Sequence, residues 1–424
     1  MNQKNKQDWM TIRKLRTTDI LGQAIKEELT GFTVIDRTDK KITTDKGKIF
    51  TEFVSCSYLG LENHPSLIEA AQQAMAETGI HLSSSRGAMR PQYLQQLEEL
   101  LSEIYGGNSV VVFTSTSNVH LGVLPLLGSG SLPSYAITRP VHWLIDKTAH
   151  ASMQVLRGVL EQFGLVSRVD SSDEESIQQA LQTCKKNNST PILLIDGIGS
   201  MTGVLPVAKL SKELSAAGGY VYVDDAHGIS IVGNYGAGYC FSSLDHKLPE
   251  NLIIASSLSK AFGGSGGFVV VKDIKDVEVI TTLANTLVFG HSIMVPMLAA
   301  NVASAKIHLT TEIQTRQKNL WKNINLFDTL SNNSLMNAGG LSPIRGAMFE
   351  NEADGFEVAR MLRDKGILLF PVFYPFISEG KALLRFAFSC EHKENEIIDL
   401  VNSLIEIKNE GFSWLTPKGI IPQV

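Results

Sequence analysis

Short apolar segments alternate with segments of helical period from about residue 50 to about residue 300. Five of the apolar segments predict buried strands: Ser109–Thr114, Pro191–Ile195, Tyr220–Val223, Leu252–Ala255 and Gly267–Val271. Between them, Gln92–Tyr105 and Val207–Ala217 have the spacing of helices with one apolar face. Continuous Val and Ile runs separated by helices are typical of a mostly parallel sheet that is covered on both faces, so the chain predicts an α/β fold.

The pattern changes after about residue 300. Ala299–Asn325 predicts one or two helices, and the segments that follow predict strand, helix, strand, strand and helix: Ile344–Phe349, Gly355–Lys365, Ile367–Val372, Leu383–Phe388 and Asn395–Lys408. The segment 1–48 is charged and weakly patterned, which predicts a helix and an arm. We therefore expect an N-terminal arm (1–50), a large domain (51–300) and a smaller α/β domain (301–424).

Composition narrows the class of protein. The 424 residues are 43% hydrophobic, so the chain can bury a sizeable core and is not mostly disordered. Its net charge of −5 gives no basic field for a nucleic acid partner. The four cysteines form no C-x-x-C motif, the N-terminus is polar, and no apolar run reaches the ~18 residues of a membrane span. We expect a cytoplasmic protein without a membrane span.

Polar side chains follow four of the predicted strands at the point where each strand ends. They are Ser115, Thr116 and Ser117 after the first, Ser200 after the second, Asp224 and His227 after the third, and Ser257 and Lys260 after the fourth. Because ligands bind beyond the carboxyl ends of the strands in an open parallel sheet, we expect these side chains to converge.

The types of these residues suggest one chemistry. A lysine amine at a crowded edge can form a Schiff base, although a lone lysine is more often a surface residue. Asp224 could keep a cationic ring nitrogen protonated, or it could cap a turn. His227 could bond a phenolic oxygen, or it could be structural. A lysine and an aspartate in these roles are what pyridoxal phosphate requires of a protein. The serine-rich segments could hold its phosphate, or they could form ordinary turns.

Other chemistries are less well supported. The spacing of His120, His142 and His150 along the chain matches no metal-ligand pattern. Residues 263–267 are glycine-rich but lack the G-K-[ST] of a nucleotide-binding loop, and no G-x-S-x-G motif indicates a serine hydrolase.

The chain resembles the α-oxoamine synthases, a branch of the fold-type-I pyridoxal-phosphate enzymes, from about Ser55 to about Ile398. Landmark motifs occur in the family's order: S-Y-L-G-L at 57–61, L-E-E-L-L at 97–101, D-K-T-A-H-A-S at 146–152, D-G-I-G-S-M-T-G at 196–203, V-D-D-A-H-G at 223–228, S-L-S-K-A-F-G-G at 257–264 and L-L-R-F-A-F-S-C-E-H at 383–392. The resemblance implies a large domain with a mostly parallel sheet that binds pyridoxal 5'-phosphate, and a smaller C-terminal domain. It also implies an acyltransferase that condenses an amino acid with an acyl thioester, of CoA or of a carrier protein, usually with decarboxylation to an α-aminoketone.

The resemblance also implies a role for individual residues. Lys260 would carry the cofactor as a Schiff base, Asp224 would pair with the ring nitrogen, and His150 would stack on the ring. His227 and Ser200 would lie near the phenolic oxygen. The phosphate would be held by Ser257 and the segment Ser115, Thr116 and Ser117. The family is homodimeric with its active site at the subunit interface, and the threonine that a partner subunit donates to the phosphate falls on or near His291 and Ser292.

Several positions depart from the family's pattern. The family's Ser-Gly-aromatic phosphate loop is Ser115-Thr116-Ser117 here, and a family asparagine falls near His120. The arginine that grips the substrate carboxylate aligns with Phe373, which leaves Arg385 or Arg86 as candidates for that contact. The alternatives are another reaction of the same fold, such as transamination or a lyase reaction, and a non-catalytic subunit of a heterodimer. The retained Lys260 and Asp224 argue against a non-catalytic subunit.

Overall fold

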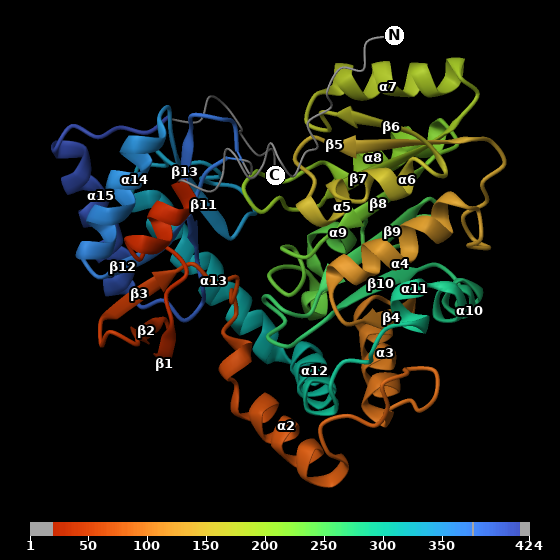
Figure 1. Cartoon of the computed structure of the whole chain (residues 1–424), viewed down its shortest axis with the longest axis horizontal. Helices are drawn as coiled ribbons and strands as arrows, with labels where there is room; N and C mark the ends of the chain where they lie inside the picture. Colours follow the sequence, from red (N-terminus) through yellow and green to blue (C-terminus); the bar gives the residue numbers. More distant parts are fainter. Residues whose placement is uncertain (1–19, 375–376, 416–424) are drawn as a thin grey trace. The chain divides into compact units, whose positions relative to one another are not determined.

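The chain forms two compact units in a computed structural model that describes residues 20–374 and 377–415 (Figure 1). The central unit comprises Ser57–Lys318, and the terminal unit combines Met1–Cys56 with Asn319–Val424. This division differs from the expected boundaries, because the N-terminal segment shares a unit with the C-terminal one and the central unit continues beyond residue 300. Residues 20–26 are helical, and the rest of the expected N-terminal helix lies outside the described residues.

A seven-stranded sheet forms the middle of the central unit, in the order β4-β10-β9-β8-β7-β5-β6. Its strands are β4 (Ser109–Phe113), β5 (Val141–Asp146), β6 (Gly164–Val169), β7 (Thr190–Asp196), β8 (Tyr220–Asp224), β9 (Leu252–Ser257) and β10 (Gly267–Val271). All neighbours are parallel except β10, which is antiparallel to both β4 and β9. The expected mostly parallel α/β fold is confirmed, with β5 and β6 added to the predicted strands.

Apolar side chains cover both faces of this sheet. In β8, Val221 and Val223 belong to one buried cluster, which includes Leu97 of α3 (Gln92–Ile104) and Leu210 of α8 (Val207–Ala216). Tyr222, between them, belongs to the opposite cluster, which includes Val123 and Leu127 of α4 (Thr116–Gly128). Successive side chains of a strand point to opposite faces, so a strand buried on both faces is apolar at nearly every position. This explains the continuous Val and Ile runs of the sequence.

Helices of the central unit connect and cover the strands (Figure 1). They are α2 (Pro65–Thr78), α3 (Gln92–Ile104), α4 (Thr116–Gly128), α5 (Ala151–Gln154), α6 (Arg157–Leu160), α7 (Glu174–Lys186), α8 (Val207–Ala216), α9 (Gly238–Ser243), α10 (Ile274–Leu283), α11 (Asn285–Val288) and α12 (Val295–His308), with single turns at Leu61–Asn63 and Asn234–Gly236. None of the helices in the described ranges is long and apolar enough to cross a lipid bilayer.

The terminal unit contains a six-stranded sheet in the order β1-β2-β3-β12-β13-β11. Its strands are β1 (Val34–Thr38), β2 (Lys41–Thr44), β3 (Ile49–Phe53), β11 (Ile344–Phe349), β12 (Ile367–Val372) and β13 (Ala382–Ala387). Its helices are α14 (Glu352–Asp364) and α15 (Glu394–Asn409), and α13 (Thr311–Leu330) crosses the boundary between the units. The first and last parts of the chain meet where β3 pairs with β12 in parallel.

A buried ion pair secures the end of β3. Lys40 is fully buried, and its ammonium contacts the carboxylate of Glu52 and donates to Ser55 Oγ at 2.9 Å. Burial alone would raise the pKa of Glu52, but the charge and hydrogen bond of Lys40 and the bonds from Ser55 outweigh it, so the pKa is lowered. Glu52 therefore stays ionised and fixes the backbone of the segment that leads to Cys56.

Candidate functional site

Lys260 and His227 lie at the carboxyl ends of the adjacent strands β9 and β8, as the sequence predicts. The Nζ of Lys260 is 2.8 Å from His227 Nε2, and His227 Nδ1 is 2.8 Å from the hydroxyl oxygen of Tyr58. His227 is buried, whereas Lys260 is partly exposed. The amine is thus positioned by an imidazole whose other nitrogen is held by a phenol.

The turn that carries Lys260 is fixed at both ends. The backbone N–H of Leu258 donates to the carbonyl of Gly266 at 2.9 Å, which closes the turn between β9 and β10. On α12, Ser304 Oγ donates to the carbonyl of Phe262 at 2.5 Å. Gly263 has φ +80°, and an added Cβ would lie 2.5 Å from Leu61 Cβ, so this position requires glycine. Lys260 therefore projects from a backbone that has little freedom to move.

Asp224 is a buried carboxylate at the end of β8. Its Oδ2 is 3.1 Å from His120 Nε2, and its Oδ1 accepts the backbone N–H of Ala226 at 3.0 Å. Burial alone would raise its pKa, but the hydrogen bond and charge of His120, followed by the charges of Lys260 and His150, lower the pKa to about 2. Asp224 therefore carries a negative charge at neutral pH.

Two neighbouring aspartates behave in the opposite way. Burial and the charge of Asp224 raise the pKa of Asp196, which is paired in register with Asp224 on the next strand. Burial also raises the pKa of the adjacent Asp225, whose Oδ2 accepts the backbone N–H of Cys240 at 2.9 Å. One carboxylate with a lowered pKa beside two carboxyls with raised pKa values is an arrangement suited to holding one cationic group.

His150 forms the N-cap of α5. Its backbone N–H donates to Asp196 Oδ1 at 3.0 Å, and its Nδ1 is 2.6 Å from Ser152 Oγ. Burial lowers its pKa against the opposing charge of Asp224, so the imidazole is neutral near pH 7. Ser200 lies in the turn after β7, which the pairing of Ile198 with Val204 closes.

The predicted phosphate segment forms the N-terminus of α4. Ser115 is the N-cap and accepts the backbone N–H of Asn118 at 3.2 Å, whereas Thr116 Oγ1 donates to the carbonyl of Ser256 at 3.2 Å. Ser117 is exposed, and Ser257 Oγ accepts the backbone N–H of Ser259 at 3.1 Å. The first N–H groups of a 13-residue helix and these hydroxyls together form an anion-binding environment.

Gly267, the first residue of β10, allows this helix terminus to approach. An added Cβ would lie 2.6 Å from the backbone N of Thr116, so Gly267→Ala is expected to push the first turn of α4 outward. We expect an overpacking cost of about 1–3 kcal/mol in the free energy of unfolding and about tenfold weaker binding of pyridoxal phosphate.

Thermal unfolding and a titration with pyridoxal phosphate measure these two effects. The matched control is Gly158→Ala on α6, where an added Cβ meets no atom within 4 Å. Unchanged cofactor affinity in Gly267→Ala would show that the terminus of α4 does not hold the phosphate.

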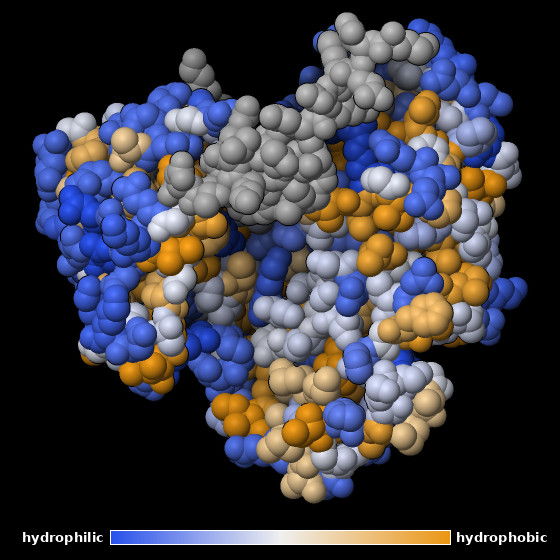
Figure 2. Space-filling view, viewed as in Figure 1, coloured by the Kyte–Doolittle hydropathy of each residue, from blue (hydrophilic) through white to orange (hydrophobic). Residues whose placement is uncertain are grey.

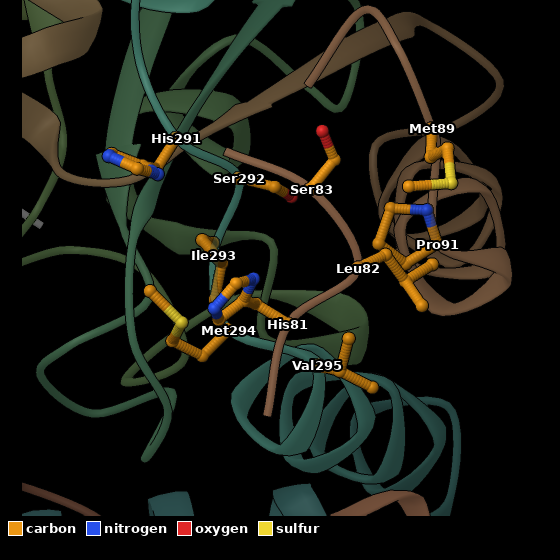
Figure 3. Close-up of a pocket in the computed structure, with 10 residues that line it drawn as sticks. All are labelled: His81, Leu82, Ser83, Met89, Pro91, His291, Ser292, Ile293, Met294 and Val295. Atoms are coloured by element: carbon orange, nitrogen blue, oxygen red, sulfur yellow. The ribbon is translucent and has the colours of Figure 1, made fainter. Parts of the chain in front are cut away.

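His291 and Ser292 lie in the segment before α12 and line a small pocket (Figure 3). The other lining residues come from the segment before α3 and from the start of α12: His81, Leu82, Ser83, Met89, Pro91, Ile293, Met294 and Val295. Among the residues that the structure describes, Ser292 Oγ is buried and has no hydrogen-bond partner.

Arg86 is already engaged within the central unit. Its Nη1 donates to the carbonyl of Val112, and its Nη2 contacts Glu98 Oε1 at 3.1 Å. The same Glu98 oxygen accepts the backbone N–H of Val112 at 3.1 Å, so Arg86 helps to tie α3 to β4. These contacts indicate a structural role for Arg86.

Arg385 and Phe373 belong to the terminal unit. Arg385 lies in β13 and is buried, and its Nη2 contacts Cys56 Sγ at 3.3 Å. Phe373 follows β12 and packs against Phe356, with ring centroids 6.3 Å apart. Their contact with a substrate stays a prediction.

The sequence did not identify three residues of the site. Tyr58 contacts His227, and Tyr222 and His120 lie behind Asp224. Tyr58 falls in the motif at 57–61, but nothing in its spacing links it to His227, which is 169 residues away. The spacing of His120 fits no metal-ligand pattern and the residue falls near a family asparagine, but neither observation predicts its contact with Asp224.

Comparison with known proteins identifies the family of the chain. The family description "Aminotransferase class I and II" matches residues 48–404. The chain is 30% identical over 367 residues to an 8-amino-7-oxononanoate synthase from Saccharophagus degradans, covering 84% of this chain and 87% of that protein. It is 26% identical over 385 residues to a serine palmitoyltransferase from Bacteriovorax stolpii, covering 89% and 87%.

A solved structure shows the same fold. A serine palmitoyltransferase from S. paucimobilis with PLP and myriocin bound superimposes with a TM-score of 0.79 at 20% identity, covering 93% of this chain and 98% of that chain. The chain belongs to the aminotransferase class I and II family, in its α-oxoamine synthase branch.

Proposed function

We propose that this protein is a pyridoxal-phosphate-dependent acyltransferase that joins an amino acid to an acyl thioester, with loss of CO2, and releases an α-aminoketone. The observation that carries the proposal is that a buried Asp224 with a lowered pKa and the amine-bearing Lys260 follow two adjacent parallel strands at the same edge of the sheet. A carboxylate for the ring nitrogen and a lysine for the aldehyde are the two groups that this cofactor needs from a protein.

The residues of the central unit fit pyridoxal phosphate. Lys260 would hold its aldehyde carbon, Asp224 its ring nitrogen, and His150 the face of its ring. The N-terminus of α4 and Ser257 would hold its phosphate, since Gly267 lets Thr116 lie close to β10. When bound, the cofactor supplies an electron sink for the negative charge that develops at the α-carbon of the amino acid.

Each of the remaining roles in the reaction would fall to a side chain of the central unit. The Lys260 amine would take the α-proton of the amino acid, and His227 would hold that amine in position through its Nε2. Tyr58 would keep the imidazole of His227 in one orientation. Asp224 would supply a fixed negative charge in a buried site, where charge interactions are stronger than in water.

The substrate carboxylate needs a cation that the family's pattern does not provide at Phe373. We propose Arg385 for this contact rather than Arg86. The guanidinium of Arg86 is bound to the carboxylate of Glu98, which neutralises its charge. Arg385 contacts the sulfur of Cys56 at 3.3 Å and the carbonyl of Val54 at 3.5 Å within the terminal unit.

We also propose that the protein is a cytoplasmic homodimer with the active site at the subunit interface. Apolar side chains gather on the surface over α2 and the start of α12 (Figure 2), and they include Ile68, Met75, Ile80 and Met294, which are 39–58% exposed. Exposed apolar patches mark interaction sites. None of the four cysteines forms a disulfide, which is usual in a reducing compartment.

A product assay tests the reaction. The purified protein, loaded with pyridoxal phosphate, is incubated with a panel of amino acids and acyl-CoA thioesters of increasing chain length. We expect free thiol to appear only when one amino acid and one thioester are both present, together with CO2 and a product of the mass of the α-aminoketone. Conversion of the amino acid to a keto acid without thiol release would contradict the proposal and indicate a transaminase.

A further inference from the structure

His120 bridges two side chains of strand β8 from the helix that covers it. Its Nε2 is 3.1 Å from Asp224 Oδ2, and its Nδ1 is 2.9 Å from the hydroxyl oxygen of Tyr222. His120 and Tyr222 are fully buried, and their rings meet edge to face with centroids 5.6 Å apart. Tyr222 and Asp224 are two positions apart in a strand, so both face α4, which carries His120.

We propose that Tyr222 and His120 form a buried positioning relay that fixes the orientation and negative charge of Asp224, and through it the proton on the ring nitrogen of the bound cofactor. The inference rests on the proposed contact between Asp224 and that ring nitrogen. His120 and Tyr222 act through Asp224 and do not touch the cofactor or the substrate.

With a single proton on the His120 imidazole, one arrangement of protons makes both hydrogen bonds of the relay. Burial and the charge of Asp224 raise the pKa of the Tyr222 phenol, so its oxygen keeps its hydrogen. The phenol donates that hydrogen to His120 Nδ1, which places the imidazole proton on Nε2. The Nε2–H then donates to Asp224 Oδ2. A tyrosine hydroxyl thus selects the tautomer of His120 that stabilises a carboxylate.

The groups around Asp224 show why its hydrogen bond with His120 determines its charge. His120, Lys260 and His150 favour the negative charge of Asp224. Asp196 and Asp225 are carboxyl groups whose own charge Asp224 disfavours. Asp196 accepts the backbone N–H of His150, and Asp225 accepts the backbone N–H of Cys240. Their pKa values rise, whereas that of Asp224, with an imidazole donor, falls.

Two conservative variants test the relay. His120→Asn keeps a short donor near Asp224 but cannot reach both partners, and Tyr222→Phe removes only the phenol oxygen. The matched control is His142→Asn, because His142 is also buried in the central unit but contacts Ser167 and Cys184. All proteins are loaded with pyridoxal phosphate labelled with ¹⁵N in its ring, and the ¹⁵N chemical shift is followed against pH.

We expect the ring nitrogen of the wild type and of His142→Asn to stay protonated through neutral pH. In His120→Asn and Tyr222→Phe, its titration midpoint is expected to move by about 1 pH unit or more to lower pH, which is a tenfold change in the protonation equilibrium. A second readout uses ¹⁵N-labelled histidine. In the wild type His120 carries its proton on Nε2, and in Tyr222→Phe a signal of the Nδ1–H tautomer appears.

The outcomes separate the relay from the proposed role of Asp224. An unprotonated ring nitrogen in the wild type would contradict the contact with Asp224 itself. A protonated wild type with unchanged midpoints in both variants, at unchanged thermal stability, overturns the relay. A titration midpoint that moves in His120→Asn but not in Tyr222→Phe would exclude Tyr222 from the relay and would also overturn the proposal. If His120→Asn does not fold, Tyr222→Phe and the tautomer measurement decide.

Discussion

Lys260→Ala is expected to abolish the covalent link between the protein and pyridoxal phosphate and to lower kcat by about 10⁴-fold. The variant loses both the amine that holds the aldehyde and the amine that takes the α-proton. The turn itself is expected to persist, because backbone bonds of Leu258, Gly263 and Gly264 hold it and none involves the lysine side chain. Thermal stability is therefore expected to change little.

The measurement is reduction of the loaded protein with borohydride followed by mass spectrometry. Wild type is expected to retain one cofactor on the peptide that contains Lys260, and the variant none. The matched control is Lys272→Ala, because Lys272 lies in the same unit and contacts Glu250 at 2.9 Å and the carbonyl of Leu248 at 3.1 Å. A cofactor that stays attached in Lys260→Ala would assign the Schiff base to another lysine.

Asp224→Asn is expected to lower kcat by about 10³-fold, although the new side chain has the same shape. Asparagine can still accept the N–H of His120, but it carries no negative charge for the ring nitrogen. The pKa of about 2 means that the wild-type group is ionised over the whole neutral range, so the substitution removes a full charge from a buried site.

The adjacent residue provides a matched control for this substitution. Burial raises the pKa of Asp225, so Asp225→Asn removes a carboxyl group whose charged form the protein disfavours, in contrast to that of Asp224. We expect kcat to change by less than about threefold, because burial already disfavours the charge of Asp225 and the hydrogen bond from Cys240 N can be kept. Steady-state kinetics and thermal unfolding of both variants test the pair. Equal losses of kcat in the two variants would show that the site requires packing rather than charge.

The sequence predicted the parts of the site that follow from strand ends. Asp224, His227 and Lys260 come directly after apolar runs, and parallel pairing alone brings adjacent strand ends together. His120 could not be placed in this way, because it lies inside a helix and meets Asp224 only after α4 packs on the sheet. Contacts that depend on the packing of distant elements leave no local pattern.

Four of the missed strands, β1 to β3 and β6, have a related explanation. β6 lies at the edge of its sheet, and several of its positions are partly exposed, so its sequence lacks a continuous apolar run. β1 to β3 are short, and charged residues such as Lys41 and Asp36 interrupt them. Their position is set by pairing with β12, which lies near the other end of the chain. Strands that are half exposed and paired over long distances are weakly encoded in local patterns.

The parallel pairing of β3 with β12 also sets an order of events during synthesis. Thr51 emerges from the ribosome long before its partner Ile367, because the whole central unit lies between them in the chain. At a synthesis rate of about 5–20 residues per second, the first three strands wait roughly 15–60 s for the rest of their sheet. The central unit is complete in the chain before β12 is made and can fold around its own sheet. The nascent N-terminal hairpin, with Ile35 and Ile49 exposed even in the finished sheet, is therefore the segment with the longest opportunity to bind chaperones or to aggregate.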